Sequence, residues 1–116
     1  MRIIAILGVL PSLLLGGPPA WAHAYLDRAS PLVGSTVAAS PGQVTLYFTQ
    51  NLERRFSRVE VRNSAGARFD QGVSVNGSIV HVSVRTLPPG TYRVSWRVLS
   101  VDTHTTEGAF SFRVGR

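Results

Sequence analysis

The feature that most constrains this chain is a two-residue alternation of apolar and polar side chains, repeated in several short segments. Successive side chains of a β-strand point to opposite faces, so each such segment predicts a strand with one buried and one wet face. The 3.6-residue spacing of an amphipathic helix does not occur. The clearest alternating segments are residues 44–48, 59–61, 80–84, 92–98 and 110–114.

Turn-forming residues separate these segments. Asn76-Gly77, between residues 73–75 and 79–84, predicts a two-residue β-hairpin. Residues 52–56 could form one helical turn or a loop. Tyr92 follows a Pro-Gly turn, where a tyrosine often caps the corner of an immunoglobulin-like sandwich; the alternative is a buried aromatic residue at a strand start. We therefore expect an all-β, two-sheet Greek-key sandwich of about seven strands.

The first residues have the pattern of a secretory signal peptide. Arg2 supplies a positive charge, residues 3–15 are mainly apolar, and Ala20-Trp21-Ala22 fits the signal-peptidase pattern. The apolar run is shorter than the roughly 20 residues of a membrane helix, although an uncleaved anchor is the alternative. We expect cleavage after Ala22, so that residues 1–22 are removed. Residues 23–116 then form one exported domain that starts at His23.

Composition excludes several classes of site. The chain has no cysteine and its one methionine is Met1, so residues 23–116 offer no disulfide and no sulfur ligand. All basic residues are arginines, and they are scattered apart from a cluster at residues 54–58. Without a basic stripe or a nucleic-acid motif, we interpret them as solvated strand faces and expect no nucleic-acid partner. No apolar stretch after the signal is long enough to cross a membrane, so we expect no membrane insertion after processing.

The chain has three histidines, and two of them are candidate metal ligands. His81 alternates with valines and is expected on the outer face of a strand, as a surface residue. Asp102 and His104 are two residues apart, a spacing that in extended backbone projects both side chains to the same side. The alternative for this pair is a polar loop in which the aspartate caps a turn.

His23 would add two nitrogens if cleavage makes it the first residue, because its α-amine and ring Nδ1 can chelate one ion. With the imidazole of His104 and the carboxylate of Asp102, the set becomes three nitrogens and one oxygen. Cu(II) favours such tetragonal sites and stands at the top of the divalent affinity order. The amine, with a free pKa near 8, must lose its proton to bind. We therefore expect one Cu(II) ion, bound more weakly as the pH falls.

The chain resembles the CopC family of periplasmic copper-resistance proteins. The resemblance starts with His23-Ala24-Tyr25-Leu26 and Ser30-Pro31-Leu32-Val33-Gly34-Ser35, and continues through residues 44–52. Its most specific part is residues 87–98 followed by Ser100-Val101-Asp102-Thr103-His104, which is similar to the family's L-x-x-G-x-Y-x-V-x-W-R-x-x-S-x-D-x-H pattern.

This resemblance implies a cupredoxin-like or immunoglobulin-like fold with a high-affinity Cu(II) site. The family's ligand roles would transfer to the amine and ring of His23 and to Asp102 and His104. The resemblance further implies a periplasmic copper carrier or buffer, working with an inner-membrane CopD-type partner, and we expect a monomer.

Three departures from the family pattern bear on the site. Gln50 stands where some members have a glutamate, and Tyr25 stands where many have a second histidine. The methionine-rich Cu(I) loop of some members has no counterpart here. The resemblance therefore implies a protein specific for Cu(II).

Two other readings remain open. One is a histidine-brace copper oxidoreductase, similar to lytic polysaccharide monooxygenases, which also use an N-terminal histidine. Against it, the Asp102 carboxylate would fill the position that oxygen chemistry leaves open, and the chain is short for a polysaccharide-binding face. The other is an immunoglobulin-like interaction module in which Asp102 and His104 are incidental. We expect a binding protein and no enzyme.

Overall fold

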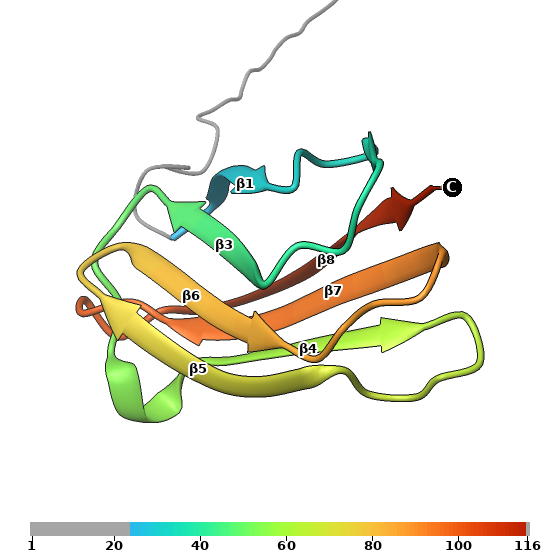
Figure 1. Ribbon diagram of the computed structural model, residues 1–116. Coiled ribbons are helices and arrows are strands. Elements are labelled where there is room, and N and C mark those ends of the chain that lie inside the picture. The colour runs from blue at the N-terminus through green and yellow to red at the C-terminus, as the bar shows by residue number, and fades with distance from the viewer. Residues whose placement is uncertain (1–23, 116) are drawn as a thin grey trace, which may run out of the picture.

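The computed structural model describes residues 24–115. The expected cleavage site and His23 lie outside the described residues. The described chain forms eight β-strands and one short 3₁₀ turn, η3, shown in Figure 1. Their bounds are β1 Leu26–Ser30, β2 Thr36–Val37, β3 Gln43–Phe48, η3 Arg54–Phe56, β4 Arg58–Asn63, β5 Asp70–Asn76, β6 Ile79–Val84, β7 Gly90–Leu99 and β8 Thr105–Val114.

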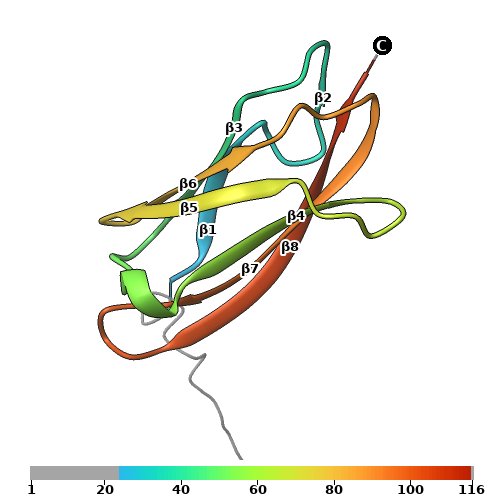
Figure 2. The same ribbon diagram turned by 60° about the horizontal axis from the view of Figure 1, so that its bottom comes forward.

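The strands form two four-stranded sheets packed face to face. One sheet has the order β1-β3-β6-β5 and the other β2-β8-β7-β4. The two layers and the connections that cross between them can be followed in Figures 1 and 2. The expected all-β sandwich is confirmed. Within residues 24–115 there is no helix long and apolar enough to span a membrane.

The period-two pattern correctly identified most strands. In β3, β4, β6, β7 and β8 the alternating apolar residues point into the sandwich, and residues such as Leu46, Val61 and Val94 are fully buried. The hairpin between β5 and β6 is also confirmed, with a shift of one residue. Asn76 pairs with Ile79, so the two-residue turn is Gly77-Ser78, and Gly77 takes the positive φ of 64° that this turn demands.

Strands β1 and β2 were not identified from the alternation. In β1 only Ala29 is buried, so the strand has no apolar stripe to detect. Strand β2 is two residues long and pairs in parallel with the C-terminal part of β8. The sequence-based count of about seven strands is close to the eight that residues 24–115 contain.

The longest hairpin, β7–β8, positions the candidate site. The two strands pair without interruption from Gly90 with Val114 to Leu99 with Thr105, and the connecting loop lies at the end beyond Leu99. At the other end the Tyr92 hydroxyl donates a hydrogen bond to the carbonyl oxygen of Pro88, at 2.5 Å. The expected tyrosine corner is therefore confirmed.

An aromatic cluster fills the core between this hairpin and β3. The ring of Trp96 packs edge-on against Phe48, with 5.8 Å between ring centroids, and lies beside Phe110. Gly108 pairs with Trp96 across the hairpin, and a Cβ at this glycine would collide with the indole ring. The residue facing Trp96 must therefore lack a side chain for the ring to lie across β8.

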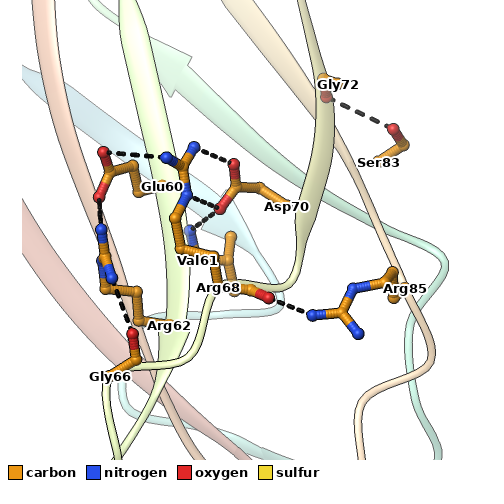
Figure 3. Close-up of polar contacts among 9 residues, drawn as sticks. All are labelled: Glu60, Val61, Arg62, Gly66, Arg68, Asp70, Gly72, Ser83 and Arg85. Carbon is orange, nitrogen blue, oxygen red and sulfur yellow. Dashed lines mark hydrogen bonds and ion pairs between the residues drawn. The ribbon is translucent and has the colours of Figure 1, made fainter.

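The edges of the two sheets meet at β4 and β5, where a polar cluster joins them (Figure 3). Asp70, at the start of β5, accepts a hydrogen bond from the backbone N–H of Val61 in β4, at 2.9 Å. Its carboxylate also binds the guanidinium of Arg68, at 2.6 Å, and Arg68 lies 3.7 Å from Glu60. Burial raises the pKa of Asp70, but the bonds from Arg68 and Val61 outweigh it, and the net pKa is lowered.

Candidate metal centre

The loop between β7 and β8 brings Asp102 and His104 together. Asp102 Oδ1 lies 3.3 Å from His104 Nδ1, and both side chains are roughly half exposed. The expected convergence is confirmed, but its expected cause, an extended backbone, is wrong. The loop is a tight turn in which Thr103 has a φ of 74° and its N–H donates to the carbonyl oxygen of Ser100, at 2.9 Å. The turn, rather than strand geometry, aims the two side chains at each other.

Ser100 is the residue that holds this turn together. It is fully buried, and its backbone N–H donates to the carbonyl oxygen of His104, at 2.9 Å. Its hydroxyl oxygen accepts a hydrogen bond from the backbone N–H of His104, at 3.3 Å, and its hydroxyl proton is donated to Asp102 Oδ1. One buried side chain thus orients the carboxylate and anchors the imidazole-bearing residue.

The same contacts set the charge of Asp102. The hydrogen bond from Ser100 lowers the pKa of Asp102 most, desolvation raises it by less, and the neighbouring His104 lowers it further, so the net pKa is lowered. Asp102 is therefore an ionised carboxylate throughout the neutral range. An exposed carboxylate beside an imidazole offers an oxygen and a nitrogen ligand to a cation in solution.

The start of the described chain is tied to the beginning of β8, two residues after His104. Ala24 is completely buried, and its carbonyl oxygen accepts a hydrogen bond from the hydroxyl of Thr106, at 2.7 Å. Tyr25 and Thr49 exchange two further bonds, from Tyr25 N–H to the Thr49 hydroxyl and from Thr49 N–H to the Tyr25 carbonyl oxygen, both at 2.9 Å. The residue next to His23 is therefore fixed beside the Asp102–His104 turn.

The segment after β3 supports the turn from its other side. Val101 N–H donates to the carbonyl oxygen of Asn51, at 3.0 Å, and Glu53 N–H donates to that of Leu99, at 2.8 Å. Gln50, where some members of the family resembled have a glutamate, directly precedes Asn51 and is partly buried. The substitution of glutamine for glutamate at position 50 thus lies in the segment whose backbone hydrogen bonds support the candidate site.

His81 lies away from this arrangement, as expected. It is on the outward face of β6, paired with Thr45 and Ser74, and its Nδ1 lies 3.1 Å from Gln43 Nε2. In the part of the chain that the structure describes, no group of three or more His, Asp or Glu side chains could hold a metal ion. Within residues 24–115, Asp102 and His104 are therefore a pair of candidate ligands.

Sequence reasoning missed two residues on which this geometry depends. Ser100 stands in the family-like motif, and its place two residues before Asp102 is a local signal for a capping hydroxyl. Thr106 gave no signal at all, because its partner Ala24 is 82 residues away in the chain.

Comparisons with known proteins agree with the fold and with the motif. The CopC domain model matches residues 26–115. Copper resistance protein C of Escherichia coli is 34% identical over 107 residues, which cover 82% of this chain and 83% of that protein. Copper transport protein CutJ of Bacillus subtilis is 33% identical over 101 residues, which are 83% of this chain but 19% of that protein. The crystal structure of CopC from Methylosinus trichosporium OB3b matches with a TM-score of 0.76 and 33% identity, over 80% of this chain and 94% of that chain. The chain therefore belongs to the CopC family.

Proposed function

We propose that this protein is exported to the periplasm and binds one Cu(II) ion as a carrier or buffer, through His23, Asp102 and His104. The observation that carries the proposal is the bond between Thr106 and Ala24, because it fixes the chain directly after His23 beside the Asp102–His104 turn. Ala24, the first described residue, lies beside this turn, which supports its sequence neighbour His23 as the remaining ligand.

The donor set favours copper in its divalent state. Cleavage after Ala22 would free the α-amine of His23, which joins its ring nitrogen, the His104 imidazole and the Asp102 carboxylate. Three nitrogens and one oxygen suit tetragonal Cu(II), and residues 23–116 contain no sulfur ligand for Cu(I). Two relatives are named for copper resistance and copper transport, which supports copper as the cargo.

The geometry of Asp102 supports binding without catalytic turnover. Its ionised carboxylate is oriented by Ser100 and lies beside His104, where it would be the fourth ligand of the ion. A histidine-brace oxidoreductase leaves that position for oxygen. With ascorbate present, we expect the copper-loaded protein to show no turnover that depends on chitin or cellulose.

An inner-membrane partner of the CopD type would exchange copper with this protein. Support comes from CutJ, in which the region similar to this chain makes up 19% of a copper transport protein. A domain of this family can therefore be part of a much larger copper-transporting chain. The present protein would meet its partner as a monomer.

Copper titration of residues 23–116, monitored by electron paramagnetic resonance, tests the ligand set. We expect saturation at one equivalent, with a type-2 spectrum that shows hyperfine coupling to several nitrogens. The matched control carries one extra methionine before His23, which removes the free amine from the chelate and should weaken binding severely. Unchanged affinity in this extended protein would show that the proposed ligands are wrong.

A further inference from the structure

We propose that the groove between η3 and strand β5 binds an extended, acidic segment of a partner protein, which adds to β5 as an extra strand. This surface goes beyond the proposed copper site and does not require copper to be bound. Four features support it: the shape of the groove, the free edge of β5, the charge on the facing wall and the position of the groove beside the copper-site loop.

The groove is large enough for a short peptide segment. It has a volume of about 640 Å³. One wall is the segment around η3 and the other is the middle of β5. The lining residues are Leu52, Glu53, Arg54, Arg55, Ser57, Val73, Ser74 and Val75.

Strand β5 is the outermost strand of its sheet, and its outer edge faces the groove. Asn76 and Ile79 flank the two-residue turn and form a hydrogen-bonded pair. Alternation along the ladder then directs the backbone N–H and C=O of Val73 and Val75 away from β6. Within the described chain β5 has no other ladder partner than β6. An exposed edge of this kind is a template for an added strand.

The facing wall has the chemistry to attract carboxylates. Arg54 and Arg55 are exposed and form no ion pair within residues 24–115, whereas Arg62, Arg68 and Arg97 all do. Glu53 also lines the groove and offsets one of the two positive charges.

Exposed apolar side chains lie next to these charges. Phe56, the last residue of η3, is 63% exposed, and Val73 is 40% exposed. Arginine and aromatic residues together are enriched in protein–protein interfaces, and a groove with an open strand edge selects a peptide that carries acidic and apolar residues in alternation. A flat anionic membrane would fit this concave surface less well.

The groove lies close to the loop that carries the proposed copper ligands. Leu52 forms a backbone bridge with Ser100, and Glu53 N–H donates to the carbonyl oxygen of Leu99. In Figures 1 and 2, η3 and the β7–β8 loop lie at the same end of the sandwich. A partner segment in the groove would therefore hold the rest of that partner beside Asp102 and His104.

The first test uses a blocked, fluorescently labelled peptide of alternating glutamate and valine, with fluorescence anisotropy and amide chemical shifts as readouts. We expect binding, with shifts concentrated in residues 52–57 and 73–75. The double variant Arg54→Glu/Arg55→Glu should weaken binding about tenfold or more, because charge complementarity is reversed. The control Arg93→Glu/Arg113→Glu makes the same change in net charge on the outer face of the other sheet, and should bind the peptide nearly as well as the unmodified protein.

A second variant tests strand addition. Val73→Pro removes a backbone N–H that points into the groove and leaves the ladder with β6 intact, since proline is tolerated at such edge positions. It should lose peptide binding, while Val73→Ala should retain most of it. Urea unfolding of both variants verifies that they remain folded.

Three results would overturn the proposal. The first is that a lysine–valine peptide binds as well as the glutamate–valine peptide. The second is that Arg54→Glu/Arg55→Glu binds the glutamate–valine peptide undiminished. The third is that the amide shifts lie outside residues 52–57 and 73–75. Binding to vesicles of anionic lipid that depends on Arg54 and Arg55, without peptide binding, would identify a lipid surface as the occupant instead. Copper titration of Arg54→Glu/Arg55→Glu should match that of the unmodified protein, so failure here is distinguishable from failure of the proposed copper site.

Discussion

The Thr106 hydroxyl donates a hydrogen bond to the carbonyl oxygen of Ala24, at 2.7 Å, and so joins the start of the described chain to the beginning of β8, two residues after His104. Ala24 is completely buried at this junction. The bond places Ala24 beside the turn that carries Asp102 and His104. Our copper-binding proposal depends on this junction.

Removing that bond should weaken copper binding without removing a ligand. In Thr106→Val the side-chain shape is nearly kept, but the hydroxyl is lost, and one hydrogen bond contributes about 1 kcal/mol. We expect Cu(II) affinity to fall roughly fivefold, as measured by competition with a chelator of known affinity. Thr105→Val, one residue earlier and exposed, is the matched control and should leave the affinity unchanged.

Substituting the proposed ligands should have larger effects. His104→Ala and Asp102→Ala should each weaken Cu(II) binding at least about a hundredfold, since each removes a donor, whereas loss of a supporting contact typically costs 10- to 100-fold. His81→Ala should bind like the unmodified protein, because His81 lies on the outward face of β6. Electron paramagnetic resonance should show fewer coupled nitrogens in His104→Ala only. Weak binding by His81→Ala would contradict this assignment.

Copper affinity should fall as the pH falls, because protons compete for the His23 amine. With a free amine pKa near 8, competition at this amine should lower the affinity about fivefold between pH 8 and pH 7, and about tenfold for each further unit. Asp102 contributes no proton in this range, because Ser100 first and His104 second lower its pKa from the usual value. Asp102→Asn should therefore lower the affinity by a constant factor. Plots of affinity against pH for the two proteins should run parallel, and converging plots would refute this account.

Asp70 should stabilise the junction of the two sheets in a pH-dependent way. Burial raises its pKa, but the bonds from Arg68 and Val61 lower it more, so the folded pKa lies below the unfolded one. A lowered pKa stabilises the folded state above the unfolded value, and that contribution is lost as the pH falls through the folded value. Asp70→Asn should reduce the free energy of unfolding at pH 7 by about 1–3 kcal/mol, measured in urea.

The difference in free energy of unfolding between Asp70→Asn and the unmodified protein should shrink in acid, because there the unmodified protein also loses the charge of Asp70. Asp27→Asn is the control, because Asp27 is exposed in β1 and its substitution should change stability by less than about 0.5 kcal/mol. An Asp70→Asn effect that stayed constant down to the acid range would show that the carboxylate charge is not its cause.

Gly108 should not tolerate a side chain. A Cβ there would overlap the indole of Trp96, and overpacking a core of this kind costs about 1–3 kcal/mol. We expect Gly108→Ala to unfold at lower urea concentration and to shift the emission of Trp96, which is the only tryptophan of residues 23–116. Gly42→Ala, where a Cβ has open space, should leave both measurements nearly unchanged.

Much of the sandwich was predictable because the signal is local. Val80 and Val82 alternate with polar neighbours because only one face of β6 is buried. The same alternation predicted that His81 lies on the outward face of this strand. Strand β1 was not predicted, because only Ala29 of its five residues is buried and its sequence shows no apolar alternation. The Asp102–His104 pair was found by its spacing, although a turn at Thr103 produces the contact that extended backbone was expected to give.

The sequence by itself determined which chemistry is available. It provides histidine and aspartate donors without sulfur, strands with one apolar face, and an arginine cluster near residue 54. The tertiary structure alone decided which of these meet. Thr106 reaches Ala24 across 82 residues, and η3 leaves the edge of β5 open, because such contacts depend on how the two sheets pack and not on any pattern within one segment.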